Sequence, residues 1–146
     1  MNLSQYRTVP YVDGGRVVSD DKEKNGLDCF GLARHALYHV FNGPLLESFN
    51  GIFRTDAVSM TSGFHRSSAQ FEKCAPQAGA LACCFHKSIT GNDVHYVFHH
   101  VGICIDGANV MHTSSKNGYA VLPVRVFKRL AHKVEFYRYV KNHDVS

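Results

Sequence analysis

Gly26-Leu27-Asp28-Cys29-Phe30-Gly31-Leu32 is the stretch of this chain that decides its fold, because it predicts the start of the clearest helix. Asp28 is a good N-cap, since a carboxylate there accepts hydrogen bonds from the first N–H groups of a helix. The apolar residues that follow recur at helical spacing and form one face, namely Leu32, Ala33, Ala36, Leu37 and Val40. Gly43-Pro44 is expected to end the helix.

Cys29 lies in the first turn of this predicted helix, directly after the capping aspartate. The partial positive charge of a helix N-terminus favours a thiolate over a thiol. Backbone N–H groups at the same place can hold an oxyanion. A cysteine in this position is therefore suited to attack a carbonyl carbon. The alternative is a small apolar core residue, because free cysteines are usually buried and inert.

The rest of the chain predicts strands after a long loop. Residues 45–75 lack steady periodicity and are predicted as a loop with one short helix near 68–74. Strands are predicted over residues 80–85, 94–105, 109–113, 119–123 and 134–140, with a hairpin turn at Asp106-Gly107 and a helical turn over 124–130. A helix followed by an antiparallel meander indicates an α+β fold, in which the helix packs on the sheet.

Two histidines are candidates for the partners of Cys29. A nucleophilic cysteine needs a base and a group that orients this base. His100 lies in the strand predicted over 94–105, and His112 ends the next strand across the Asp106-Gly107 turn. In an antiparallel hairpin these two residues lie approximately opposite one another and project to one face, whereas His99 is expected to point to the other face. The other seven histidines have no partner that the sequence identifies: His35, His39, His65, His86, His95, His132 and His143.

Three blocks in this order resemble the NlpC-type cell-wall cysteine peptidases, a bacterial and phage branch of the papain-like fold. The first, Pro10-Tyr11-Val12-Asp13-Gly14-Gly15, is similar to the family's Pro-Tyr-x-x-Gly-Gly turn. The second is the stretch quoted above, which is similar to its Asp-Cys-x-Gly-Leu nucleophile block. The third, His100-Val101-Gly102-Ile103 followed by His112, resembles its His-Val-Gly-Ile strand and third polar residue. The resemblance spans roughly residues 9–115.

The resemblance implies one papain-like cysteine hydrolase domain over residues 1–146, with a nucleophile-bearing N-terminal helix packed on an antiparallel sheet. It implies that Cys29 is the nucleophile, His100 the general base and His112 the group that orients His100. It also implies that Tyr11, Asp28 and Phe30 bind substrate, with Tyr11 at the rim of the site. The resemblance implies neither a metal nor a cofactor.

Two departures from the family pattern bear on the substrate. Many members have serine after the cysteine, where it helps to bind the free amine of a peptide, and here Phe30 occupies that place. A phenylalanine after the cysteine is similar to the sequence pattern of the phage tail-associated branch of the family. The family also has a Pro-Gly-Asp block that opens the first core strand, and here Gly79-Ala80 replaces its Gly-Asp, so the contacts of that aspartate are missing.

The activity implied by the resemblance is that of a cysteine peptidase, or thiol protease, that hydrolyses an amide bond in the stem peptide of bacterial peptidoglycan. The γ-D-glutamyl-diaminopimelate bond is the first choice, and a phage tail component or a delivered cell-wall-degrading effector fits a chain of this size. The alternatives are a thiol acyltransferase or lipid-directed hydrolase of the same fold, a non-catalytic phage tail structural protein, and a metal-binding module that uses His100, Cys104 and His112. The last has no evident fourth ligand.

Charge and composition limit the classes of partner that are expected for this protein. The net charge of +4 suits an anionic partner, but the basic residues are scattered, so nucleic acid is not expected. The N-terminus lacks the apolar core of a signal peptide, and no stretch has the length of a membrane span. The protein is therefore expected to be made in the cytoplasm and to act at the cell wall or periplasm, as an effector or a virion component. The expected partners are the peptidoglycan stem peptide and either phage tail proteins or an immunity protein, and not a membrane.

Overall fold

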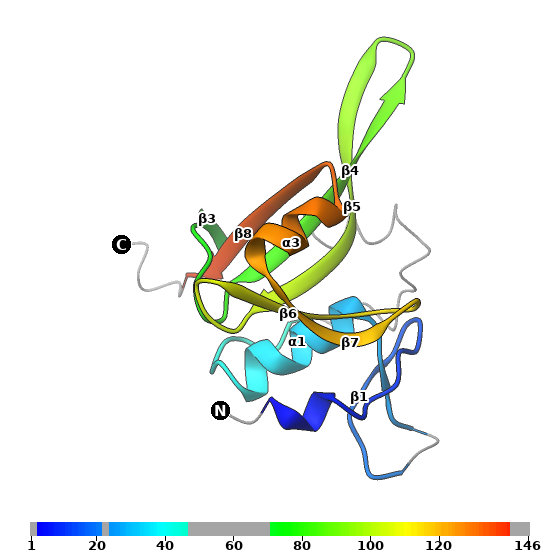
Figure 1. Ribbon diagram of the computed structural model, residues 1–146, viewed down its shortest axis with the longest axis vertical. Coiled ribbons are helices and arrows are strands. Elements are labelled where there is room, and N and C mark those ends of the chain that lie inside the picture. Colours follow the sequence, from blue (N-terminus) through cyan, green and yellow to red (C-terminus); the bar gives the residue numbers. More distant parts are fainter. Residues whose placement is uncertain (1–2, 22–23, 47–70, 141–146) are drawn as a thin grey trace.

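The computed structural model describes residues 3–21, 24–46 and 71–140 (Figure 1). In chain order the elements are η1 (Ser4–Tyr6), β1 (Arg16–Val17), β2 (Gly26–Leu27), α1 (Cys29–His39), β3 (Phe71–Cys74), β4 (Leu81–Thr90), β5 (Asp93–Cys104), β6 (Asn109–Ser114), β7 (Gly118–Pro123), α3 (Val124–Phe127), η4 (Lys128–Leu130) and β8 (Lys133–Tyr139). The fold is thus a mixture of helix and antiparallel sheet, and the predicted α+β class is confirmed at that level.

The main sheet has six strands in the order β3-β8-β4-β5-β6-β7, and each strand is antiparallel to its neighbours. Helix α1 packs against β5 and β6. In Figure 1, α1 lies on one side of β6 and α3 lies on the other. The sheet therefore separates two layers, one built around α1 and one built around α3.

Side-chain alternation along the strands supplies a core for each layer. On the α1 side, the helix residues Leu32 and Ala36 pack in one cluster with Val101, Ile103 and Met111 of the strands. The second cluster contains the alternate strand residues together with Phe127 of α3; its buried members are Ala80, Ala82, Cys84, Cys104, Val110, Phe127 and Phe136. Neighbouring residues of a strand thus join different layers, because their side chains point to opposite faces of the sheet.

The start of α1 is held by backbone contacts that require glycine. The main chain of residues 10–15 pairs with that of 26–28, through Leu27 N–H to Pro10 O at 3.1 Å and Asp28 N–H to Gly15 O at 3.2 Å. A Cβ atom on Gly31 would lie 2.1 Å from Gly15 O, and one on Gly15 would lie 2.6 Å from Gly26 O. The glycines of the two blocks therefore let the loop lie directly on the helix start, and Gly14 and Gly15 are half-buried there.

Gly31→Ala is expected to lower the free energy of unfolding by at least about 2 kcal/mol, because backbone must move to make room for the methyl group. Chemical denaturation monitored by circular dichroism measures this change. Gly107→Ala is the matched control, since a Cβ atom there would meet Pro76 O at an ordinary 3.4 Å. Equal stabilities of the two variants would show that the close packing of loop and helix is not required.

The sequence predicted most of the sheet. Strands β4 to β8 and the turn over α3 and η4 agree with the predicted ranges, except that β4 extends to Thr90. The helix predicted near 68–74 is wrong for residues 71–74, which form β3 and pair with β8, so tertiary pairing overrides the local pattern. The other residues of that predicted helix, and the loop over 47–70, lie outside the described residues. The short β1–β2 pair was not predicted.

Helix α1 begins where predicted and ends earlier than predicted. It ends at His39, and Val40 is its C-cap. Asn42 then adopts a left-handed conformation with φ 58°, and Gly43 N–H donates to Leu37 O at 2.7 Å. The chain therefore leaves the helix before Gly43-Pro44.

Candidate active site

Cys29 is the first residue of α1, and Asp28 caps the helix as predicted. Asp28 Oδ1 accepts a hydrogen bond from Gly31 N–H at 2.8 Å, while its main-chain carbonyl accepts from Leu32 N–H at 2.9 Å. Cys29 itself is fully buried and belongs to the cluster on the α1 side of the sheet. The thiol thus lies at the positive end of the helix dipole, within the apolar cluster on this side of the sheet.

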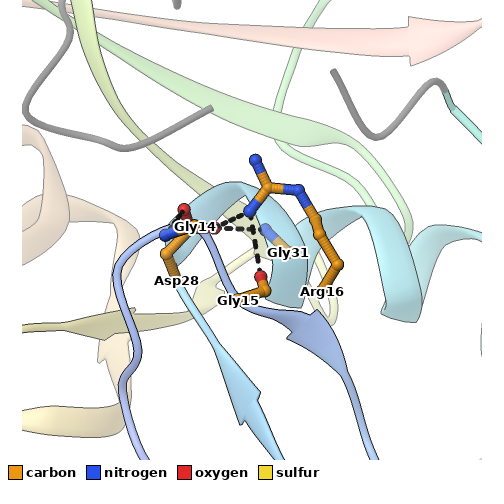
Figure 2. Close-up of polar contacts among 5 residues, drawn as sticks. All are labelled: Gly14, Gly15, Arg16, Asp28 and Gly31. Carbon is orange, nitrogen blue, oxygen red and sulfur yellow. Dashed lines mark hydrogen bonds and ion pairs between the residues drawn. The ribbon is translucent and has the colours of Figure 1, made fainter. Parts of the chain in front are cut away.

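Arg16 completes the anchoring of Asp28 (Figure 2). Its Nη1 donates to Asp28 Oδ1 at 2.7 Å and to Gly15 O at 2.9 Å, and Asp28 Oδ2 accepts from Gly14 N–H at 3.0 Å. The ion pair is shielded from water, because the side chains of Arg16 and Asp28 are 10% and 1% exposed. The Asp28 carboxylate therefore accepts three hydrogen bonds within the protein, and a substrate ammonium would have to compete with Arg16 for it.

The other two predicted substrate-binding residues lie around this anchor. The main chain of Tyr11 forms a bridge with Leu27, two residues before the cysteine. Phe30 is half-buried, and the guanidinium carbon of Arg16 lies 5.1 Å from the centroid of its ring. A cation over an aromatic face at this distance is attractive. Tyr11, Asp28 and Phe30 therefore gather at the start of α1, together with Arg16.

The two predicted histidines form a buried pair. His100 Nε2 and His112 Nδ1 are 2.9 Å apart, and both side chains are almost fully buried. Gly102 leaves room for this approach, because a Cβ atom there would lie 3.3 Å from His112 Cβ. Burial lowers the pKa of His112, which favours the neutral form of its ring. The prediction that His100 and His112 project together from adjacent strands is confirmed.

Phe127 of α3 covers the imidazole pair. The centroid of its ring lies 6.0 Å from that of His100 and 5.4 Å from that of His112, and Phe127 is fully buried. An apolar ring in this position keeps water from the hydrogen bond between the imidazoles, which strengthens that bond.

The structure brings His100 and His112 together, and it brings Tyr11, Asp28 and Phe30 to the helix start beside Cys29. The two groups belong to neighbouring elements, because α1 packs on the strands that carry the histidines. Cys29 lies in the cluster on the α1 side, whereas the ring contacts of the histidines are with Phe127 of the second cluster. The contacts described here thus place Cys29 and the histidine rings in different clusters. Their direct contact is part of the function that is proposed below.

The expectation for His99 is wrong, because a β-bulge interrupts the alternation. Cys84 pairs with His100 while Phe85 pairs with Phe98, so His99 is the extra residue of β5. Its ring stacks on that of His86 at 3.5 Å between centroids and lies 6.4 Å from that of His100. His86 is two residues from Cys84 on β4, so His99 joins the face that carries His100.

The metal-binding alternative is not supported by the described residues. They contain no group of three or more histidine, cysteine, aspartate or glutamate side chains arranged to hold a metal ion. Cys104 lies in the same cluster as Phe127, on the side of the sheet whose ring contacts include His100 and His112.

Arg16 and Phe127 are site residues that the sequence did not identify. Arg16 follows Gly14-Gly15 directly in the sequence. Its position predicts an ion pair with Asp28 only when Asp28 is known to be buried, because a buried carboxylate needs a partner of opposite charge. Phe127 lies in the predicted helical turn, and its contact with the imidazoles depends on how that turn crosses the sheet.

No helix within residues 3–21, 24–46 and 71–140 is long and apolar enough to cross a membrane. Comparison of the chain with models of protein families, with curated proteins and with solved structures gives no match, so the resemblance to the NlpC-type peptidases rests on the three sequence blocks alone.

Proposed function

We propose that this protein is a papain-like cysteine peptidase that hydrolyses an amide bond in the stem peptide of bacterial peptidoglycan, with the γ-D-glutamyl-diaminopimelate bond as the first choice. In this proposal Cys29 is the nucleophile, His100 the general base and His112 the residue that orients His100. The protein would act at the cell wall, as a phage tail component or a delivered effector.

One observation carries the proposal. Helix α1 begins with Cys29, directly after the buried cap Asp28. It packs on β5 and β6, which carry His100 and His112, and His100 Nε2 lies 2.9 Å from His112 Nδ1. Nucleophile, base and orienting group are the three parts that thiol catalysis needs. A structural protein would gain little from a buried imidazole pair, since two apolar side chains fill the same space without loss of hydration.

The imidazole pair also fixes the direction of proton transfer. His100 must accept a proton on Nδ1, because Nε2 is engaged with His112. Neutral His100 then carries its own proton on Nε2 and donates it to His112 Nδ1, and His112 carries its proton on Nε2. The Cys29 thiolate adds to the amide carbonyl carbon, His100 returns the proton to the leaving amine, and water hydrolyses the thioester that remains.

The decisive experiment is digestion of purified peptidoglycan, with mass analysis of the released fragments. The proposal predicts new peptide ends at one amide bond of the stem peptide, absent with the Cys29→Ala protein. Release of fatty acid from lipids, or acyl transfer to an added amine without hydrolysis, would favour the alternative thiol chemistries. An unaltered wall in every preparation of folded protein would overturn the proposal.

A further prediction concerns the amine of the stem peptide. Phe30 cannot accept a hydrogen bond from an ammonium group, and the Arg16 guanidinium lies over its ring. A buried ammonium without a partner is costly, and a neighbouring cation adds repulsion. We therefore expect the enzyme to cut intact, glycan-attached peptidoglycan at least as fast as stem peptides with a free N-terminal amine.

The assay compares intact sacculi with amidase-released stem peptides at matched bond concentration. Phe30→Ser should shift the ratio of rates toward the released peptides, while Phe41→Ser, a half-buried phenylalanine beyond the end of α1, is the control that should leave the ratio unchanged. A strong preference of the native enzyme for the released peptides would contradict this account of Phe30.

A further inference from the structure

A cleft of about 530 Å³ lies between the segment that carries η1 and the chain that joins β1 to β2. Its volume is within the roughly 300–1,000 Å³ of ligand-binding clefts. Five of the described side chains that line it are polar and two are valines; the polar ones are Gln5, Thr8, Ser19, Asp20 and Asn25. The candidate active site uses none of these residues, so the cleft is a second place where a ligand can bind.

The side chains of this cleft suit an uncharged polar ligand. Amide and hydroxyl side chains both donate and accept hydrogen bonds, as the hydroxyl groups of a sugar do. None of the described residues that line the cleft is a lysine or arginine, and the Asp20 carboxylate repels an anion. Val9 and Val18 add an apolar surface. An acetamido group carries a donor, an acceptor and a methyl group, so an N-acetylated sugar matches this combination.

Hydrogen bonds within the chain hold one wall of the cleft in place. Asn25 Oδ1 accepts from Ser19 N–H at 3.1 Å, which fixes the rotation of the amide and leaves its Nδ2 group as a donor. Ser19 Oγ accepts from Asp21 N–H at 3.1 Å. Ser19 and Asn25 are half-buried, as a wall requires. Thr8 and Asp20, by contrast, are exposed. The wall is thus ordered before a ligand arrives, which lowers the entropic cost of binding.

The cleft is close enough to Cys29 for one substrate to reach both. Asn25 is four residues before Cys29, so their Cα atoms lie at most about 14 Å apart. On the other side the lining ends at Val9, two residues before Tyr11, whose main chain forms a bridge with Leu27. In the proposed substrate two residues join the scissile amide to the glycan strand, and they span about 10 Å when extended. A stem peptide with its amide at Cys29 therefore brings the attached sugar within reach of the cleft.

We propose that this cleft binds an N-acetylated sugar of the glycan strand, with hydrogen bonds from Asn25 and to Asp20. The choice of the glycan rests on the proposed function, because a hydrolase of the stem peptide meets this sugar next to its scissile bond. Such a site adds affinity for the intact wall that a released stem peptide cannot gain. The effect has the same direction as the one expected from Phe30 but arises from different residues.

The test is calorimetric titration of the native protein with a soluble tetramer of N-acetylglucosamine, which carries no stem peptide. Asn25→Ala should weaken binding by about fivefold to tenfold, because one or two hydrogen bonds are lost. Asp20→Ala changes an exposed side chain, so the fold is kept, and it should weaken binding by at least about threefold. The matched control, Asn92→Ala, should bind as the native protein does. Asn92 is exposed between β4 and β5, whose hairpin projects at the far end of the molecule from β1 (Figure 1).

A tetramer of glucose, which lacks the acetamido groups, tests the class of sugar and should bind at least about tenfold more weakly. Equal binding of the two tetramers would overturn the assignment to an N-acetylated sugar. Failure of the N-acetylglucosamine tetramer to saturate the protein, or equal affinities of the native protein and both cleft variants, would overturn the site. These outcomes leave the proposed function intact, because no cleavage is measured. Binding that Asn25→Ala weakens supports the site even if no peptidoglycan is digested.

Discussion

Cys29→Ala is expected to lower the rate of peptidoglycan hydrolysis by about ten-thousand-fold, because covalent chemistry cannot start without the thiolate. The variant should fold, since alanine fits the space of a buried cysteine and is favoured at the first turn of a helix. Cys29→Ser tests the same point with nearly unchanged volume, because a hydroxyl in this position is far less ionised than a thiol. Fragment release measured by mass spectrometry gives the rates, and circular dichroism confirms the fold.

The matched control for this prediction is Cys74→Ala. Cys74 is a partly exposed cysteine at the end of β3, in a different part of the sheet. Its loss should change the rate by less than about twofold, as surface substitutions away from a site usually do. A folded Cys29→Ala protein that retained a tenth or more of the native rate would exclude Cys29 as the nucleophile.

His100→Ala is expected to lower the hydrolysis rate by about a thousandfold, which is the usual contribution of a general base. His112→Ala should lower it less, by about tenfold to a hundredfold, because water can replace part of an orienting hydrogen bond. His99→Ala is the internal control. Its ring lies on the same face as His100 but stacks on His86, so its removal should change the rate by less than about threefold. Steady-state kinetics of the three variants, with thermal unfolding of each, measure these effects.

Equal losses in His99→Ala and His100→Ala would contradict the assignment of the base. That result would mean that the bulge in β5 brings His99 rather than His100 toward the substrate, or that both substitutions lower the rate by destabilising the fold. The bulge makes this comparison necessary, because strict alternation would have made His99 irrelevant by position alone.

Local patterns of the sequence predicted the helix and the strands of this fold. The Asp28 cap, the apolar spacing over α1 and the Asp106-Gly107 turn act between near neighbours, so they are visible in the sequence. Asp106 Oδ1 accepts hydrogen bonds from Ala108 N–H and Asn109 N–H, both at 2.8 Å, which holds the turn before β6. This turn sets the register that brings His112 to His100.

Features that depend on distant contacts were not predicted. Strand β3 forms because β8 lies beside it, and the bulge at His99 changes the facing of one residue without any mark in composition. The ion pair of Arg16 with Asp28 likewise depends on the glycine contacts that bring the 10–15 segment onto the helix. The glycines of the blocks were visible in the sequence, but the close approach that they permit was not.

The proposed activity requires that a substrate reach the buried thiol of Cys29. Cys29 is fully buried, so the proposal requires that the start of α1 open to a substrate. Burial raises the pKa of Cys83 and raises that of Cys104 to about 12, which disfavours the thiolate form of these two cysteines. Exposure alone would favour Cys74, which is the one described cysteine that is not fully buried.

The most direct test of the central claim is therefore alkylation of the native protein by iodoacetamide at neutral pH, with peptide mass analysis of each cysteine over time. The account predicts that Cys29 is modified first and faster than Cys74, and that hydrolytic activity is lost in step with its modification, because the helix N-terminus and, in the proposed site, the His100 imidazole favour the thiolate. Modification of Cys74 with Cys29 unmodified, or full activity after Cys29 is alkylated, would contradict the claim that Cys29 is the nucleophile.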